Sequence, residues 1–239
     1  MNKGLCIRLL GQVTIMLEGS QVTELPSRTA EALLIYLVCQ QRPFAREVLA
    51  DLLWDDRPQQ QALANLRSIL SSLRRVFGSY MIITRQTVAF NHDSDYFLDV
   101  AQFERLLDTE RLETGDYPTT RLPNYETTRL QNAIALYRGD FLDGFYLRNR
   151  RGFEEWTAVQ RERWRRKAIL ALRQLVNHAL RCGQYQAGIR DAGHWLRLDP
   201  FNEEAHRQMM LLQARAGQYN AALRQYQACR QLLADELGI

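Results

Sequence analysis

The feature that most constrains the fold of this 239-residue chain is an internal repeat near its carboxyl end. Gly183-Gln184-Tyr185 recurs as Gly217-Gln218-Tyr219, and Ala187 recurs as Ala221, in both cases with an offset of 34 residues. A period of this length is typical of a repeated pair of helices, in which each unit buries its apolar face only against its neighbours. The repeat therefore predicts a stack of helices whose concave surface binds partner segments.

Two further features assign this period to tetratricopeptide-like helix pairs. Arg190 recurs as Arg224, and Leu198-Asp199-Pro200 ends the first unit as such units often end. Tyr185 and Tyr219 are expected to be packing residues rather than ligands. The pattern predicts helices at about residues 99–112, 123–138, 152–182, 184–197, 202–216 and 218–236, with one long loop from Gly115 to Pro123.

The first ninety residues have a different pattern, in which strands come first and helices follow. Apolar residues alternate over residues 5–9 and 13–17, which predicts a strand pair, and a third short strand is expected near Val22. Pro26 and Ser27 indicate the start of a helix, because Ser is a favourable N-cap and Pro suits a first turn. A second helix is predicted over residues 46–53, a third up to Gly78, and a hairpin over residues 81–84 and 87–90.

The third helix and the hairpin lie in a stretch with an unusual charge distribution. From Arg57 to His92 the chain runs 36 residues without Asp or Glu, although it contains five arginines. The formal net charge of the chain is only +4, so the position of the positive charge matters more than its sum. A basic segment without acidic residues is what a polyanion-binding surface requires.

On the third helix, Leu63, Leu66, Leu70, Leu73 and Phe77 form one apolar stripe. The opposite face carries small polar residues, which permit close approach to a groove, and Asn and Arg, which can form paired hydrogen bonds with base edges. The order of strands, three helices and hairpin therefore predicts a winged helix-turn-helix domain that binds double-stranded DNA. The candidate DNA-binding residues are Arg57, Asn65, Arg67, Ser68, Ser71, Ser72, Arg74, Arg75 and, at the hairpin tip, Arg85.

The expected fold class is mostly α with a small β part. A polar segment over residues 91–97 is interpreted as a linker, which divides the chain into a DNA-binding domain at residues 1–97 and a helical domain at residues 98–239. Asp93, Asp95 and Asp99 resemble a calcium loop only superficially, because the glycine and the distal glutamate of such a loop are absent. No metal site and no cofactor are expected.

The order of several short motifs resembles the SARP family of bacterial transcriptional activators. In the N-terminal part these motifs are Leu9-Leu10-Gly11, Leu25-Pro26-Ser27-Arg28, Leu33-Leu34-Ile35-Tyr36-Leu37, Leu52-Leu53-Trp54, Ala64-Asn65-Leu66-Arg67 and Leu73-Arg74-Arg75. In the C-terminal part they are Asp99-Val100, Phe103, Tyr137-Arg138-Gly139-Asp140-Phe141-Leu142, Trp156, Arg161-Glu162-Arg163, Leu198-Asp199-Pro200 and Asp235-Glu236-Leu237-Gly238.

This resemblance implies an OmpR-type winged helix followed by a bacterial transcriptional activator domain. It also implies an activator that binds direct repeats as side-by-side protomers and contacts the RNA polymerase holoenzyme. Ala45 departs from the family pattern, in which Ser or Thr usually caps the second helix. Val76 and Phe77 also replace the more usual Ala and Leu.

A basic run over residues 148–167 admits more than one interpretation. It contains eight Arg and Lys against three Glu. Such a run is most often a solvated helix face, and the alternatives are a second contact with the DNA backbone or a docking surface for an acidic segment of the polymerase.

The sequence lacks the signatures of other classes of protein. There is no GxxxxGK[ST] loop, GxSxG elbow or HExxH helix, so an enzyme is not expected. The four cysteines show no CxxC spacing and no run is long enough to span a membrane, which favours a reduced, cytoplasmic, nucleoid-associated protein without a membrane partner. Two alternatives stay open: a helical-repeat protein-interaction module, and the DNA-binding head of a larger signalling ATPase.

Overall fold

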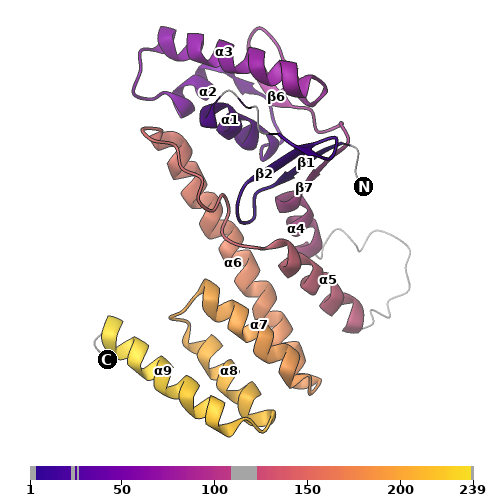
Figure 1. Ribbon diagram of the computed structural model, residues 1–239, viewed down its shortest axis with the longest axis vertical. Helices are drawn as coiled ribbons and strands as arrows, with labels where there is room; N and C mark the ends of the chain where they lie inside the picture. The colour runs from indigo at the N-terminus through magenta and orange to yellow at the C-terminus, as the bar shows by residue number, and fades with distance from the viewer. Residues whose placement is uncertain (1–3, 23–24, 26, 109–122, 238–239) are drawn as a thin grey trace. The chain divides into compact units, whose positions relative to one another are not determined.

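The computed structural model describes residues 4–22, 25, 27–108 and 123–237 (Figure 1). The chain forms two compact units that do not follow chain order. Residues 1–102 and 138–162 make the first unit, and residues 103–137 and 163–239 make the second. Helices α4 (Asp99–Leu107) and α6 (Arg151–Arg181) therefore contribute residues to both units.

The first unit begins with a small mixed sheet in the strand order β3-β2-β1-β7. Strands β1 and β2 pair antiparallel, with Leu5 opposite Leu17, and β7 pairs with β1 in parallel. Leu5 and Ile7 are buried on one face of β1, as the alternation predicts. The strands are β1 (Leu5–Arg8), β2 (Thr14–Leu17), β3 (Ser20–Gln21) and β7 (Tyr96–Leu98).

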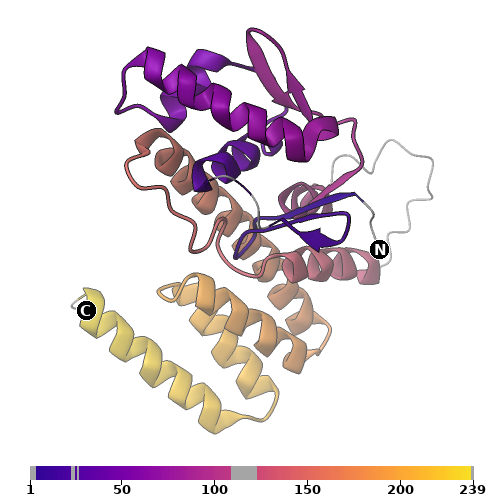
Figure 2. The same cartoon turned by 45° about the horizontal axis from the view of Figure 1, so that its top comes forward.

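Three helices and a second sheet complete the winged helix (Figure 2). The Ser27 side chain accepts a hydrogen bond from the Ala30 amide and caps the first helix, which confirms the predicted start. The helices are α1 (Arg28–Val38), α2 (Arg46–Leu53) and α3 (Gln59–Phe77). Strand β4 (Phe44–Ala45) precedes α2, and the strands β5 (Met81–Ile83) and β6 (Thr87–Phe90) follow the short helix η1 (Gly78–Tyr80). The three strands pair in the order β4-β6-β5.

The interpretation of residues 91–97 as a linker is wrong for the end of that segment. Tyr96 and Phe97 belong to β7 and pair with Leu5 and Cys6 of β1. His92 is also held in place, because one ring nitrogen lies 2.7 Å from the Gln40 carbonyl oxygen and the other lies 2.8 Å from the Tyr96 hydroxyl. Polar composition concealed this strand, since its apolar partner lies some ninety residues earlier in the sequence.

A segment from the C-terminal half of the sequence also packs into the first unit. The Leu142 amide donates to the Leu9 carbonyl over 2.9 Å, and the Gly11 amide donates to the Asp140 carbonyl over 3.0 Å. Gly11 has a φ of 103°, a conformation that L side chains rarely adopt. A Cβ at Gly139 would lie 3.2 Å from the Gly11 Cα, so both glycines permit the close crossing.

Asp99, the first residue of α4, fixes the backbone just after β1. Its carboxylate is 1% exposed and accepts hydrogen bonds from the Leu9 and Leu10 amides at 2.8–3.0 Å. The Arg138 guanidinium lies 3.2 Å away and balances the buried charge. Burial nevertheless raises the pKa of Asp99 above its ordinary value, against the lowering effect of these donors.

The second unit is helical. Leu172 and Val176 of α6 pack with Trp195 and with residues of the following helix in one buried cluster. His206, also buried, lies with one ring nitrogen 2.8 Å from the Pro200 carbonyl oxygen and the other 2.7 Å from the Gln225 amide nitrogen. Besides parts of α4 and α6, the unit contains α5 (Pro123–Leu136), α7 (Tyr185–Leu198), α8 (Glu203–Arg215) and α9 (Tyr219–Leu237).

The predicted fold class is confirmed: the chain is mostly α with a small β part, a winged helix-turn-helix and a tetratricopeptide-like helical region. Gly183 and Gly217 both have positive φ, near 70° and 76°, which explains why the repeat keeps glycine at these turns. The helix predicted at 99–112 ends at Leu107. Its expected extension and most of the expected loop from Gly115 to Pro123 lie outside the described residues.

Candidate nucleic-acid interface

Helix α3 is held against the first unit by one apolar stripe. The stripe includes Leu66, Leu70, Leu73 and Phe77, all buried as predicted, whereas Leu63 is only half-buried. Ala62 and Ile69 complete the buried face. Because these side chains fix the rotation of the helix about its axis, the opposite face is presented outward.

The predicted DNA-binding residues lie largely on that outward face. Seven of them are exposed and two, Asn65 and Ser72, are half-buried. The Ser72 hydroxyl donates to the Ser68 carbonyl over 3.3 Å, so it is engaged within the helix. The exposed residues are Arg57, Arg67, Ser68, Ser71, Arg74, Arg75 and Arg85.

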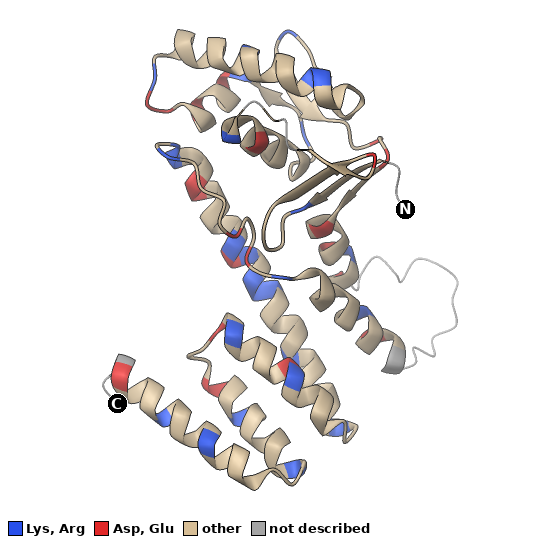
Figure 3. Cartoon of the chain, in the orientation of Figure 1, with Lys and Arg blue, Asp and Glu red and all other residues tan. Residues whose placement is uncertain are grey.

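The five arginines of this surface have no partner among the described residues. Within the described part of the chain, none of their guanidinium groups makes a hydrogen bond or ion pair. Figure 3 shows the corresponding charge pattern, in which α3 and the β5–β6 hairpin carry basic residues and no acidic ones. An unpaired guanidinium keeps its full hydrogen-bonding capacity for an external acceptor such as a phosphate. The five residues are Arg57, Arg67, Arg74, Arg75 and Arg85.

The hairpin turn that carries Arg85 is well braced. The Thr84 hydroxyl accepts hydrogen bonds from the Gln86 and Thr87 amides at 3.2 and 2.8 Å. From the start of α2, the Arg46 guanidinium donates to the Thr84 carbonyl over 2.6 Å. Sequence reasoning missed this role of Arg46, because its partner lies 38 residues away. The turn therefore presents Arg85 from a defined backbone rather than from an unsupported loop.

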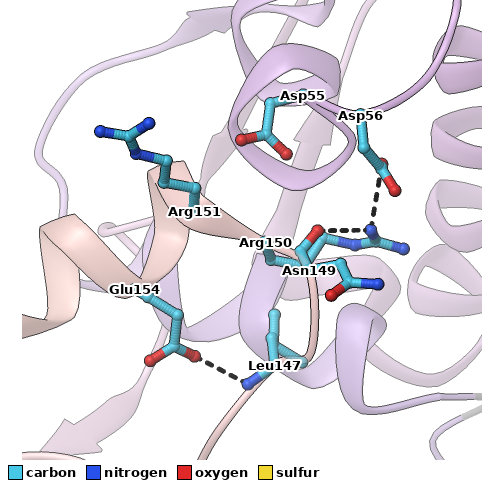
Figure 4. A pocket seen from close by; sticks show the side chains of 7 residues that line it. All are labelled: Asp55, Asp56, Leu147, Asn149, Arg150, Arg151 and Glu154. Atoms are coloured by element: carbon cyan, nitrogen blue, oxygen red, sulfur yellow. Dashed lines mark hydrogen bonds and ion pairs between the residues drawn. The ribbon is translucent and has the colours of Figure 1, made fainter.

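The loop between α2 and α3 is also fixed. The Arg150 guanidinium lies 3.2 Å from the Asp56 carboxylate, and the Glu154 carboxylate accepts from the Leu147 amide over 2.7 Å (Figure 4). These residues line a pocket of about 380 Å³. Because the Arg150–Asp56 ion pair and the Glu154–Leu147 hydrogen bond both lie in its wall, the pocket suits a structural junction rather than a ligand site. Arg57 follows directly after this braced segment.

Within the basic run at residues 148–167, several cations have structural partners. The Arg161 guanidinium donates to the Phe141 and Leu142 carbonyls, both at 2.8 Å. In the second unit, Arg163 and Lys167 both contact the Glu104 carboxylate, whose pKa is lowered by these cations despite partial burial. Much of this run therefore stabilises the fold, in contrast to the unpaired arginines of α3.

The described residues also bear on two other kinds of site. No group of three or more His, Cys, Asp and Glu side chains is arranged to hold a metal ion there. In the same residues, no helix combines the length and the apolar character needed to cross a membrane.

Comparison with known proteins gives concordant matches. The family model of the bacterial transcriptional activator domain matches residues 98–239. The chain is 25% identical over 237 residues to the regulatory protein AfsR of Streptomyces coelicolor, covering 97% of this chain and 22% of AfsR. It is 23% identical over 245 residues to the regulatory protein DnrI of Streptomyces peucetius, covering 98% of this chain and 86% of DnrI.

The transcriptional regulatory protein EmbR of Mycobacterium tuberculosis matches in both sequence and structure. The sequences are 24% identical over 247 aligned positions, which cover all of this chain and 60% of EmbR. The solved structure of EmbR in complex with a low affinity phosphopeptide superposes with a TM-score of 0.71 at 22% identity, over 98% of this chain and 61% of that one. This chain thus spans only part of AfsR and EmbR.

The structural match extends over the winged helix and the helical repeats together, and the family model covers more than half of the sequence. The chain therefore belongs to the bacterial transcriptional activator domain family, in the SARP-type arrangement that places this domain after a winged helix.

Proposed function

We propose that this protein is a sequence-specific DNA-binding transcriptional activator. Helix α3 enters the major groove, and Arg85 at the hairpin tip reaches an adjacent phosphate or the minor groove. The observation that carries the proposal is the set of five unpaired arginines on α3, its preceding loop and the hairpin. The relatives, which are named as regulatory proteins, support the same conclusion.

The outward residues of α3 divide into two roles. Arg74 and Arg75, in the last turn, supply mainly phosphate contacts, which set affinity and its dependence on salt. We expect Asn65, Arg67, Ser68 and Ser71 to contact bases, and each good paired contact is worth about 1–3 kcal/mol of discrimination. Ser72 contributes less than its neighbours, because its hydroxyl is already bonded within the helix.

We further propose that two protomers bind side by side on direct repeats and contact RNA polymerase. The DNA-binding domain comprises residues 1–97, and the helical domain at residues 98–239 makes the protein contacts. The boundary is supported by the family model, which begins at residue 98. Transcription with purified polymerase from a promoter carrying the selected repeats should rise when the protein is added, and unchanged transcript levels would count against activation.

The first test is selection of bound fragments from a random double-stranded DNA pool at low and physiological salt. Enrichment of direct repeats spaced by about one helical turn, roughly 10–11 base pairs, is the expected result. Recovery of no motif, with weak binding that disappears at physiological salt, would reduce DNA to a nonspecific contact. The protein would then be better described as a helical-repeat interaction module.

Substitutions on α3 test the docking mode itself. Arg74→Ala should weaken binding to all sequences and reduce the slope of log affinity against log salt by about 1. Arg67→Ala should cost about 1–3 kcal/mol and relax the preference at one base position. Arg207→Ala is the matched control, because Arg207 is exposed on α8 and should leave both quantities unchanged. Equal behaviour of the Arg74 and Arg207 variants would exclude this docking.

A further inference from the structure

The 34-residue repeat extends to the outward residues of α6 and α8. Packing residues recur in such an array because the helix turns and the core require them, but outward positions have no such requirement. All four arginines of the recurring outward set are exposed, and so is one of its two glutamines. Their recurrence therefore points to a role other than packing. We call this set the repeated arginine face, and it consists of Arg173, Gln174 and Arg181 of α6 and Arg207, Gln208 and Arg215 of α8.

The two halves of the repeated arginine face lie side by side within the second unit. The Arg173 guanidinium lies 3.0 Å from the Glu204 carboxylate, so this ion pair bridges α6 and α8 at one end of the face. In the described part of the chain, the other three arginines of the face have no hydrogen-bond or ion-pair partner. An unpaired guanidinium keeps its donors for an external acceptor. The face is thus an open cluster of positive charge on the helical repeats.

The surface is hollowed beside the α6 half of this face. A pocket of about 500 Å³ is walled by the first turns of α5 and by α6, and Gln174, Asn177 and Arg181 line its α6 side. Leu130 and Leu175 supply the apolar part of the wall, and both are buried in the cluster that joins the two helices. The repeated arginine face therefore has depth at α6 and continues onto the neighbouring α8.

The spacing of side chains along α8 matches that of an extended peptide. Arg207, Leu211 and Arg215 follow one another at intervals of four residues, and Leu211 is 43% exposed between the two exposed arginines. Four residues of an α-helix advance about 6 Å along its axis. Alternate residues of an extended chain point to the same side and lie about 6.6 Å apart. An extended segment along α8 can therefore place acidic side chains at i and i+4 opposite the arginines and an apolar side chain at i+2 opposite Leu211.

The same residues favour a peptide over a nucleic acid. A DNA strand carries phosphates all along its backbone, so one of them would lie against the apolar Leu211 instead of a cation. The glutamines of the face both donate and accept hydrogen bonds, which suits the N–H and C=O groups of a peptide backbone. The positive charge of the face is complementary to acidic side chains.

We propose that the repeated arginine face, together with Leu211, binds an extended acidic segment of a partner protein. The segment carries acidic residues at i and i+4 and an apolar residue at i+2. Arg207 and Arg215 pair with its carboxylates along α8, and the α6 half of the face contacts its flanking residues. This inference rests on the proposed role of the helical domain in protein contacts and is independent of DNA binding by α3.

The test is an NMR titration of the complete chain with a defined probe. The probe is an end-capped peptide of sequence Ser-Asp-Ser-Leu-Ser-Asp-Ser. Saturable chemical-shift changes are expected at the α8 amides around Leu211, and the affinity should fall with added salt. Arg207→Glu and Arg215→Glu should each weaken binding by about fivefold or more, and Leu211→Ser by about threefold. A peptide with lysine in place of both aspartates should produce no saturable changes.

The matched control is Arg224→Glu, which makes the same change in net charge at an exposed arginine of α9. This variant should bind the peptide as tightly as the parent protein does. All variants should keep the circular dichroism spectrum of the parent, since the substituted side chains are exposed. Absence of saturable shift changes, or an equal loss of affinity in the Arg224 variant, would overturn the proposal.

Two further outcomes would also overturn it. If duplex DNA shifted the same α8 amides and Arg207→Glu abolished the effect, the face would bind nucleic acid. If the protein dimerised in a concentration-dependent way that Arg207→Glu abolished, the face would be an interface between two copies. Selection of a DNA motif tests the function proposed for α3 separately, so either proposal can fail while the other stands.

Discussion

At the scale of single residues, Asp99 shows how one buried carboxylate can organise a chain reversal. It offers two acceptor oxygens to the Leu9 and Leu10 amides, which an asparagine could not satisfy in the same way because its amide nitrogen only donates. Its charge is balanced by Arg138, from the segment that pairs with the backbone just after β1. The buried polar backbone beside β1 is therefore satisfied by residues from a distant part of the sequence.

Asp191 of α7 provides a test of stability against pH. Burial raises its pKa to about 6, against a lowering effect of Arg190. The folded protein therefore binds a proton between about pH 4 and 6 that the unfolded chain, with an ordinary Asp pKa near 3.9, does not bind. The stability linked to this proton is fully present below about pH 4 and is lost as the pH rises through 6.

The substitution Asp191→Asn should remove the part of the pH dependence of stability that comes from this carboxyl group. Because Asp191 is only partly buried, the gain in unfolding free energy at pH 7.5 should be modest, about 1 kcal/mol, and it should vanish near pH 4. Urea unfolding of both proteins across this range measures the difference. Asp108→Asn, at an exposed residue just after α4, is the control and should behave as the parent. If Asp191→Asn had the same stability as the parent protein at every pH, the assignment would be contradicted.

At the scale of elements, the crossing of α7 and α8 depends on a glycine. A Cβ at Gly188 would lie 2.6 Å from the Leu212 Cδ2 and 3.0 Å from the Ala179 Cβ, and the latter has little freedom to move. Gly188→Ala should therefore destabilise the second unit by roughly 1–2 kcal/mol, since overpacking outweighs the gain in helix propensity. Thermal unfolding followed by circular dichroism measures this loss.

Gly193 of the same helix is the matched control. There an added Cβ would meet the Met209 Cε at 3.5 Å, an ordinary contact. Gly193→Ala should consequently be neutral or stabilising by up to about 1 kcal/mol, because alanine favours the helix. If both alanine variants gave the same change in stability, close helix approach would not be the reason for glycine at position 188.

The elements that local pattern determines were predictable from the sequence. Helix α2 has the predicted bounds, and the predicted cap at Ser27 is present, since both depend on residues a few positions apart. Strands β4 and β7 were missed because each is short and forms only by pairing with a distant strand. The candidate DNA-binding face could be predicted from helical periodicity. The hydrogen bond of Ser72 within the helix and the support of the hairpin by Arg46 were evident only from the three-dimensional structure.

At the scale of the whole molecule, sequence order and compact units differ. Residues 138–162 follow α5 in the chain but pack with the winged helix, where Phe141 is fully buried and its ring lies 5.7 Å from that of Trp156. No local pattern reveals such a return, because its signals are a few glycines and aromatic residues. The Tyr137 to Leu142 motif, noted for its family resemblance, thus contains the residues that pair with the backbone just after β1.

This arrangement predicts that residues 1–97 are less stable alone than within the complete chain. The fragment lacks Asp99 and residues 138–162, so the Leu9 and Leu10 amides lose their acceptors, and each unsatisfied buried donor costs about 1–3 kcal/mol. Hydrogen exchange should therefore show weak protection of both amides in the fragment and strong protection in the complete chain. Phe141→Ala in the complete chain isolates the packing contribution and should lower stability by about 3–5 kcal/mol. Full protection in the fragment would mean that the winged helix folds without this segment, and that the returning chain serves only to connect the two units.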